Sequence, residues 1–139
     1  MTETLIMQAR EASENAHVPY SSYPVGAALE TQTGGVFVGC NIENANYSNS
    51  LHAEEVAIAE AVKTGHTVFK RIAVSSTARD GVTPCGMCRQ TLAEFADEDL
   101  EILCDTGDGV DRYTLGELLP EAISEELLQQ ASQRREVDE

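Results

Sequence analysis

Residues 52–76 read HAEEVAIAEAVKTGHTVFKRIAVSS, and this stretch decides the fold. Alanines and branched apolar residues dominate residues 52–63, which predicts a helix that closes near Gly65. The apolar run at residues 71–76 then predicts a strand. A helix followed directly by a strand is typical of α/β domains, in which helices cover a central sheet.

Further elements flank this stretch on both sides. The upstream sequence predicts a first helix that ends before Pro19, followed by a β-hairpin with Gly34-Gly35 at its turn. The remaining predicted elements are the hairpin strands 25–30 and 36–40, a loop at 77–84, a helix at 85–96, strands at 100–104 and 112–114, and a terminal helix from Ser124. This order predicts a single domain over residues 1–139, folded as a three-layer α/β/α sandwich with a mixed, roughly five-stranded sheet. The polar tail, residues 129–139, is expected to fray.

The charge balance is strongly acidic. The chain carries 24 Asp and Glu against 9 Lys and Arg, for a net charge of −15. Such a charge repels phosphate backbones and anionic lipid surfaces, so we expect neither nucleic acid nor a membrane as a partner. The acidity also fits solvation in a salt-rich cytoplasm, where ionic strength screens self-repulsion. A halophilic protein and a merely acidic one are both compatible with the sequence.

The cysteines are expected to stay reduced. Residues 1–15 lack the apolar core of a signal peptide, and no apolar run approaches the roughly 20 residues of a membrane helix. These features predict a cytoplasmic protein. In that compartment Cys85 and Cys88 are expected to be metal ligands rather than disulfide partners. Cys40 and Cys104, each at the end of a predicted strand, are expected to be core residues.

Two short motifs lie at the starts of the central helices: HAE at residues 52–54 and PCGMC at residues 84–88. Two cysteines three positions apart in a first helical turn project to one side, so Cys85 and Cys88 can bind one metal ion. His52 would supply a third ligand. Three protein ligands leave one coordination position for water, which is the arrangement of catalytic zinc. The positive ends of the two helix dipoles favour thiolates at this place.

Glu54 follows His52 by two positions, near enough to reach a water molecule on the metal. Its expected role is to accept a proton from that water and to deliver it to the departing group. The pattern H-x-E followed by P-C-x-x-C is the known signature of zinc deaminases. A redox C-x-x-C pair and a structural zinc site are the alternatives, but no further Cys or His lies nearby to complete four ligands.

In these motifs the chain resembles the cytidine deaminase family in its short-chain form. The resemblance rests on PYSSYPVGAAL at 19–29, GCNIENA at 39–45, HAE at 52–54, PCGMCRQ at 84–90 and ELLP at 117–120. It implies zinc-dependent hydrolytic deamination of cytidine and deoxycytidine to uridine and deoxyuridine. It also implies one Zn²⁺ per subunit and assembly into a homotetramer.

The resemblance further implies how a nucleoside would bind. Asn41 and Glu43 would hydrogen-bond the ribose hydroxyls, and Tyr23 would pack near the nucleoside. The backbone N–H of Ala53 and the carbonyl of Thr83 would bind the edge of the pyrimidine. For Asn41, Glu43 and Tyr23 the alternative is a role in shaping their loops.

The chain departs from the family pattern at three positions. His52 stands where a third cysteine is usual, and Glu55 stands where an arginine often follows the catalytic glutamate. A neutral imidazole removes one negative charge from the metal site, so these two changes are expected to compensate each other. Ile123 stands where a phenylalanine commonly reaches the base in a neighbouring subunit. Deamination of another small base such as guanine, polynucleotide editing and a purely structural zinc domain are the remaining alternatives.

Overall fold

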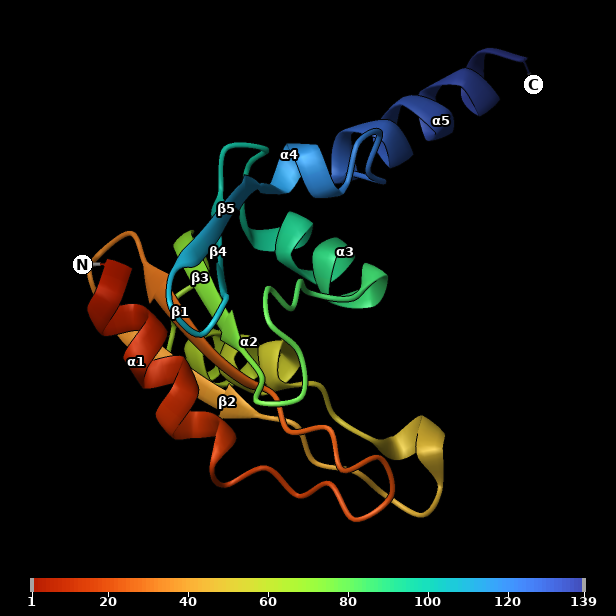
Figure 1. Cartoon of the computed structure of the whole chain (residues 1–139). Coiled ribbons are helices and arrows are strands. Elements are labelled where there is room, and N and C mark those ends of the chain that lie inside the picture. Colours follow the sequence, from red (N-terminus) through yellow and green to blue (C-terminus); the bar gives the residue numbers. More distant parts are fainter. Residues whose placement is uncertain (1, 139) are drawn as a thin grey trace.

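A single mixed sheet of five strands runs through the middle of the computed structural model, which describes residues 2–138 (Figure 1). The strands are β1 (Gly26–Thr31), β2 (Val36–Cys40), β3 (Phe69–Ser75), β4 (Glu101–Asp105) and β5 (Val110–Thr114). They lie in the order β2-β1-β3-β4-β5. Strands β3 and β4 run parallel, whereas β1 pairs antiparallel with β2 and β3, and β4 pairs antiparallel with β5. The mixed sheet predicted from the sequence is confirmed.

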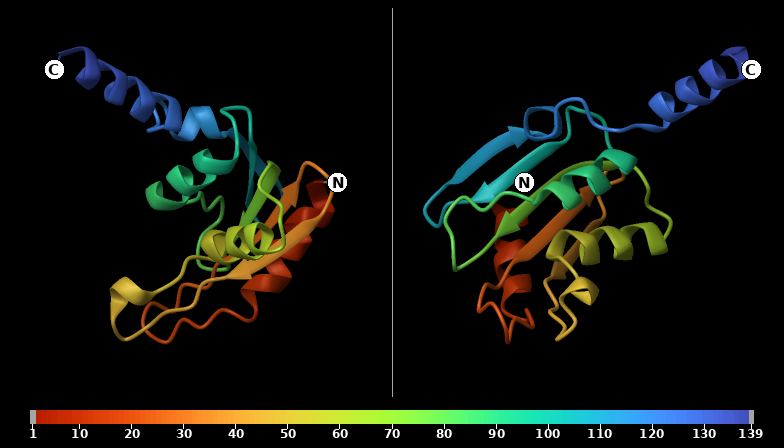
Figure 2. Two further views of the ribbon diagram at one scale, coloured as in Figure 1. Left: turned by 180° about the vertical axis from the view of Figure 1, so that it is seen from behind. Right: turned by 90° about the vertical axis from the view of Figure 1, so that its right-hand side faces the viewer.

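Helices cover both faces of this sheet. They are α1 (Thr2–Ser13), α2 (Ala53–Lys63), α3 (Gly86–Phe95), the short α4 (Leu115–Leu118) and α5 (Glu125–Asp138), with a 3-10 turn, η1, at Tyr47–Asn49. Helix α1 packs on one face, and α2 and α3 pack on the other (Figures 1 and 2). The predicted three-layer α/β/α sandwich is therefore confirmed.

Side-chain alternation along the central strands builds one core on each face of the sheet. Leu29 of β1 and Ile72 of β3 belong to the core under α2 and α3, whereas Ala73 belongs to the core under α1. All three are fully buried. Cys104 of β4 is also buried in the core under α2 and α3, as predicted. Cys40, at the end of β2, is only half-buried.

Gly39 allows the start of α2 to lie directly against β2. A Cβ atom at this position would stand 2.3 Å from the carbonyl oxygen of Ala53 and 2.6 Å from the nitrogen of Ala57. Such distances are too short for any side chain, so only glycine fits. Ala53 and Ala57 are themselves fully buried, and their small side chains permit the close approach. This contact fixes where the first turn of α2 stands relative to the sheet.

The C-terminal region differs from the prediction. Helix α4 has no counterpart among the predicted elements, although Thr114 and Glu117 form a capping box at its start. Residues 129–138, expected to fray, instead continue α5 as a helix that projects from the rest of the chain (Figures 1 and 2). Glu139 lies outside the described residues. Among residues 2–138, no helix combines the length and the apolarity needed to cross a membrane.

Candidate active site

The three predicted metal ligands lie together at the starts of α2 and α3. His52 is the N-cap of α2, Cys85 is the N-cap of α3, and Cys88 lies in the first turn of α3. The Nδ1 atom of His52 is 3.1 Å from the Sγ atom of Cys85 and 3.3 Å from that of Cys88. All three donor atoms lie within 4.8 Å of one another. Two segments far apart in the sequence thus present one nitrogen and two sulfur atoms to a single point.

This donor set fits zinc. A tetrahedral ion with Zn–N of about 2.0 Å and Zn–S of about 2.3 Å separates neighbouring ligand atoms by about 3.5 Å, close to the spacing of the cluster. Burial raises the pKa of the Cys88 thiol well above its ordinary value, and the nearby charge of Glu54 adds to that shift. A bound cation would reverse the shift because it stabilises the thiolate. Within the described part of the chain, no other group of three metal-ligating side chains converges in this way.

The carboxyl group of Glu54 is buried beside the cluster. Glu54 lies in the first turn of α2, and only 5% of its surface is exposed. Burial raises its pKa, while interactions with its own backbone, with His52 and with the Cys88 thiol partly offset that rise. A carboxyl group with a raised pKa holds a proton more readily than an ordinary one, which suits general acid–base chemistry.

Glu55 holds the N-cap of α2, a role that was not predicted. Its Oε1 atom accepts a hydrogen bond of 2.9 Å from the backbone N–H of His52. This contact is one half of a capping box, in which a side chain three residues into the helix binds the backbone of the N-cap. The spacing was visible in the sequence, but a capping box is normally recognised from Ser or Thr at the N-cap rather than from His.

A pocket of about 400 Å³ opens beside the cluster and gathers most of the predicted substrate contacts. Its lining includes Tyr23, Asn41, His52, Ala53, Glu54, Thr83 and Cys85. Glu43 lies instead in an adjoining pocket, also of about 400 Å³, which shares Asn41 and His52 with the first. Arg79 and Arg89 line the main pocket as well, and neither was predicted to belong to the site.

Asn41 and Glu43 hold the loop that leads from α1 into β1. The Asn41 side chain accepts a hydrogen bond of 2.9 Å from the N–H of Val25 and donates one of 2.8 Å to the carbonyl of Tyr23. Glu43 Oε1 accepts bonds from two successive backbone N–H groups, the first from Tyr20 at 3.0 Å. The loop-shaping alternative therefore applies to both residues. A side-chain amide has two donor and two acceptor sites, so Asn41 keeps one of each for a substrate.

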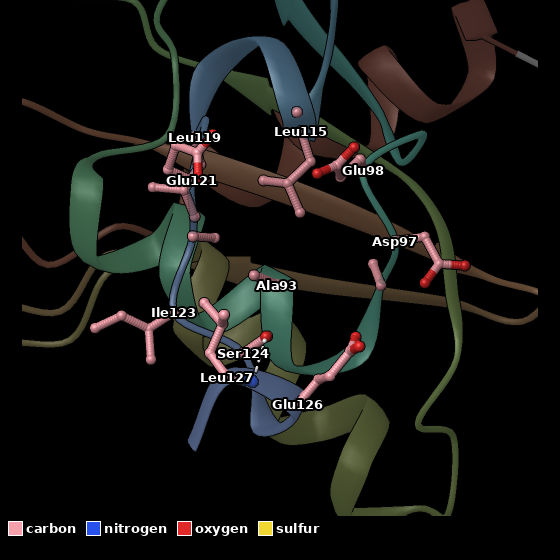
Figure 3. Close-up of a pocket in the computed structure, with 13 residues that line it drawn as sticks. Ala93, Asp97, Glu98, Leu115, Leu119, Glu121, Ile123, Ser124, Glu126 and Leu127 are labelled. Atoms are coloured by element: carbon pink, nitrogen blue, oxygen red, sulfur yellow. Dashed lines mark hydrogen bonds between the residues drawn. The ribbon is translucent and has the colours of Figure 1, made fainter. Parts of the chain in front are cut away.

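A further cavity of about 450 Å³ lies between α3, α4 and the start of α5, and it shares no lining residue with the pocket beside Glu54 (Figure 3). Ile123 lines this cavity and is 64% exposed. Its carbonyl oxygen accepts a hydrogen bond of 2.9 Å from the side chain of Gln90 in α3. Within its own chain, Ile123 is therefore separate from the candidate active site.

The fold is an α/β domain, and the site has the features of a catalytic metal centre. Three metal-ligand atoms converge beside a buried carboxyl group and an open pocket. A family model described as "Cytidine and deoxycytidylate deaminase zinc-binding region" matches residues 1–104. The chain belongs to this family of deaminases.

Known proteins resemble the chain over most of its length. A cytidine deaminase from Sporosarcina psychrophila is 41% identical over 133 residues, which cover 95% of this chain and 98% of the relative. A cytidine deaminase from Halalkalibacterium halodurans is 40% identical, with 89% of this chain and 95% of the relative covered. The crystal structure of cytidine deaminase from Burkholderia pseudomallei matches with a TM-score of 0.83 and 39% identity, over 88% of this chain and 99% of that one.

Proposed function

We propose that the chain is a zinc-dependent enzyme that deaminates cytidine and deoxycytidine by hydrolysis to uridine and deoxyuridine, a reaction of pyrimidine salvage. The convergence of His52, Cys85 and Cys88 beside the buried carboxyl group of Glu54 carries this proposal. The adjacent pocket of about 400 Å³ falls in the size range of small-molecule sites. The relatives described above, which are named cytidine deaminases, support the choice of substrate.

One zinc ion per chain would be held by the Nδ1 atom of His52 and the sulfur atoms of Cys85 and Cys88. Held by three protein ligands, zinc would supply a hydroxide nucleophile at neutral pH, because it lowers the pKa of a bound water to about 7. Glu54 would move two protons in turn: it accepts one from the attacking water and delivers it to N3 of the pyrimidine, and it then accepts a second from the new C4 hydroxyl and delivers it to the amino group, which leaves as ammonia. Its burial shields these transfers from bulk water and raises its pKa, which favours the protonated form that donates to the pyrimidine.

The remaining pocket residues would orient the nucleoside. The N–H of Ala53 belongs to the first turn of α2, where backbone donors lack helical partners, and it would bind the pyrimidine edge together with the carbonyl of Thr83. The spare donor of Asn41 and the carboxylate of Glu43 would bind the ribose hydroxyls, and Tyr23 would pack against the nucleoside. A free base would leave the ribose-binding groups unpaired, so this arrangement favours nucleosides.

Ammonia release from cytidine, deoxycytidine, cytosine and guanine, at low and at molar potassium chloride, tests the proposal. The zinc-loaded protein is expected to turn over both nucleosides, and Glu54→Ala is expected to keep the zinc and lose the reaction. Turnover of a free base but not of the nucleosides would overturn the substrate while keeping the chemistry. Bound zinc with no turnover of any of the four compounds would favour a structural zinc domain.

We further propose that the whole chain forms one domain and assembles as a homotetramer in a salt-rich cytoplasm. Ile123, Leu127 and Leu128 support the assembly, because they leave apolar side chains 64%, 50% and 63% exposed around the start of α5. The net charge of −15 supports the salt-rich setting. Light scattering is expected to give four times the 15.0 kDa mass of the chain. Full folded stability at low salt would contradict the halophilic part.

A further inference from the structure

Two segments of the family pattern take no part in the proposed reaction: Arg89-Gln90, directly after the second cysteine, and residues 117–120. The structure joins them. The guanidinium of Arg89, in α3, donates a hydrogen bond of 2.9 Å from Nη1 to the carbonyl oxygen of Leu118, at the end of α4. Gln90 donates a second bond, of 2.9 Å, to the carbonyl oxygen of Ile123. The C-terminal segment is thus fixed to the helix that carries both cysteines.

The same guanidinium also holds the loop that enters α3. Arg89 Nε donates a hydrogen bond of 2.8 Å to the carbonyl oxygen of Pro84, and Nη2 donates one of 3.2 Å to the hydroxyl of Thr83. Pro84 is fully buried and directly precedes Cys85. Pro84 has no N–H group, so its backbone cannot donate a hydrogen bond that would hold the loop. Its buried carbonyl oxygen needs a donor, and Arg89 supplies one.

We infer that Arg89 is a positioning residue for the metal site: it fixes residues 83–84 so that the Cys85 thiol stays directed at His52 and Cys88. Cys85 is exposed, and although it is the N-cap of α3, its side chain makes no capping hydrogen bond to the helix. The guanidinium of Arg89 holds the two residues that directly precede this helix end. The inference rests on the proposed function of the site.

An arginine is required because three acceptors lie in different directions around one group. The guanidinium presents five N–H donors in a planar fork, whereas an ammonium group is a compact point charge that cannot reproduce this geometry. Arg89→Lys therefore keeps the charge and removes this set of hydrogen bonds. Thr83→Val removes a single acceptor and keeps the shape of the loop side chain.

Zinc affinity, measured by competition with a chromogenic chelator, and the absorption bands of the Co²⁺-substituted protein, which report thiolate coordination, test the inference. Both Arg89→Lys and Arg89→Met are expected to bind zinc about 10- to 100-fold more weakly, the usual effect of removing an outer-shell partner of a metal site, with altered cobalt bands. Thr83→Val is expected to weaken zinc less than either. Arg112→Met is the matched control, because Arg112 makes an exposed ion pair with Glu101 on the far side of the sheet and should leave both readouts unchanged.

The outcomes separate a positioning role from a purely structural one. Lower melting temperatures for the Arg89 variants with unchanged zinc affinity and cobalt bands would overturn the inference. If Arg89→Met does not fold, Arg89→Lys and Thr83→Val decide between the same two results. Failure of the wild-type protein to bind zinc or to release ammonia would instead overturn the proposed function, whatever the variants do.

Discussion

The two helix starts that meet at the metal site are supported very differently. Helix α2 is embedded in the molecule: Ala53, Ala57 and Ala61 are fully buried against the sheet. Helix α3 is less deeply seated, and its buried residues are Cys88 and Leu92. The histidine ligand therefore lies at the start of a helix that packs tightly against the core. The two cysteines lie at the start of a helix with fewer buried residues.

The helix ends differ in the same sense. Glu55 binds the backbone of His52 as part of a capping box, but the side chain of Cys85 makes no capping hydrogen bond, and Arg89 holds the loop before it. A metal ion at this site would join the start of α2, which is firmly packed, to the start of α3, which is less firmly packed. Packing changes on the α2 side should therefore act mainly through folding, and changes on the α3 side mainly through metal affinity.

The largest effect is expected at Glu54, where the two halves meet. Glu54→Gln keeps the size and shape of the side chain but removes its ability to carry protons. Turnover of cytidine should fall by about 10²- to 10⁴-fold, while the zinc content stays at one ion per chain. Steady-state kinetics together with metal analysis measure both quantities, and substantial turnover by the variant would exclude Glu54 as the general acid and base.

A matched pair of glycine substitutions tests the difference in burial. Gly39→Ala places a Cβ atom 2.3 Å from a backbone oxygen of α2 and should lower the free energy of unfolding by about 3 kcal/mol. Gly86→Ala, in the first turn of α3, meets nothing within 4 Å and should cause no loss, because alanine is the better helix former. Urea unfolding measures both. Equal destabilisation by the two substitutions would contradict the contrast between the helices.

The pairing of His52 with Glu55 makes a third prediction. His52→Cys adds a negative charge next to the Glu55 carboxylate, so zinc affinity should fall about tenfold or more, and added Glu55→Arg should restore part of it. Chelator competition on the single and double variants measures the coupling. A single variant with wild-type affinity and activity would show that the two positions are independent.

A pH-dependent effect on folding is expected at the far end of the loop that leads to Cys85. Gly81 in this loop donates its N–H to the carbonyl of Asp105 at 2.8 Å. Hydrogen bonds from Arg10 lower the pKa of the Asp105 carboxyl from 3.8 to about 2. The carboxylate therefore stabilises the folded state by about 2 kcal/mol above pH 3.8, and this stabilisation disappears as the pH falls toward 2.

Arg10→Met removes the largest cause of that shift, while the hydrogen bonds from Ser75 and Gly107 remain, and it should move acid unfolding to higher pH. Urea unfolding between pH 2 and pH 5 measures the effect. The difference between the variant and the wild-type protein should be full near pH 5 and absent near pH 2. A difference that does not change with pH would mean that Arg10 acts by packing alone.

Local sequence signals were sufficient for the elements around the site. The alanine-rich pattern and Gly65 predicted α2, and Gly34, with φ of 91°, stands at the hairpin turn as expected. The first-turn spacing of Cys85 and Cys88 predicted that both thiols project to one side of the helix start, where the structure places them. These features depend on residues within one or two turns of each other.

The remainder depends on contacts between distant segments, which carry no local signal. Nothing near Arg89 in the sequence indicates that its guanidinium meets Leu118, and nothing near Asn41 indicates that its amide holds Tyr23. Helix α5 has few apolar residues and no amphipathic pattern, so its polar second half suggested a frayed tail rather than the helix that extends to Asp138.

Zinc K-edge X-ray absorption on the purified, catalytically active protein tests most directly whether His52, Cys85 and Cys88 hold one catalytic zinc ion. We expect two sulfur atoms at about 2.3 Å and two nitrogen or oxygen atoms at about 2.0–2.1 Å, the second being an exchangeable water. A shell with three or four sulfur atoms, or full deaminase activity without bound zinc, would contradict the assignment.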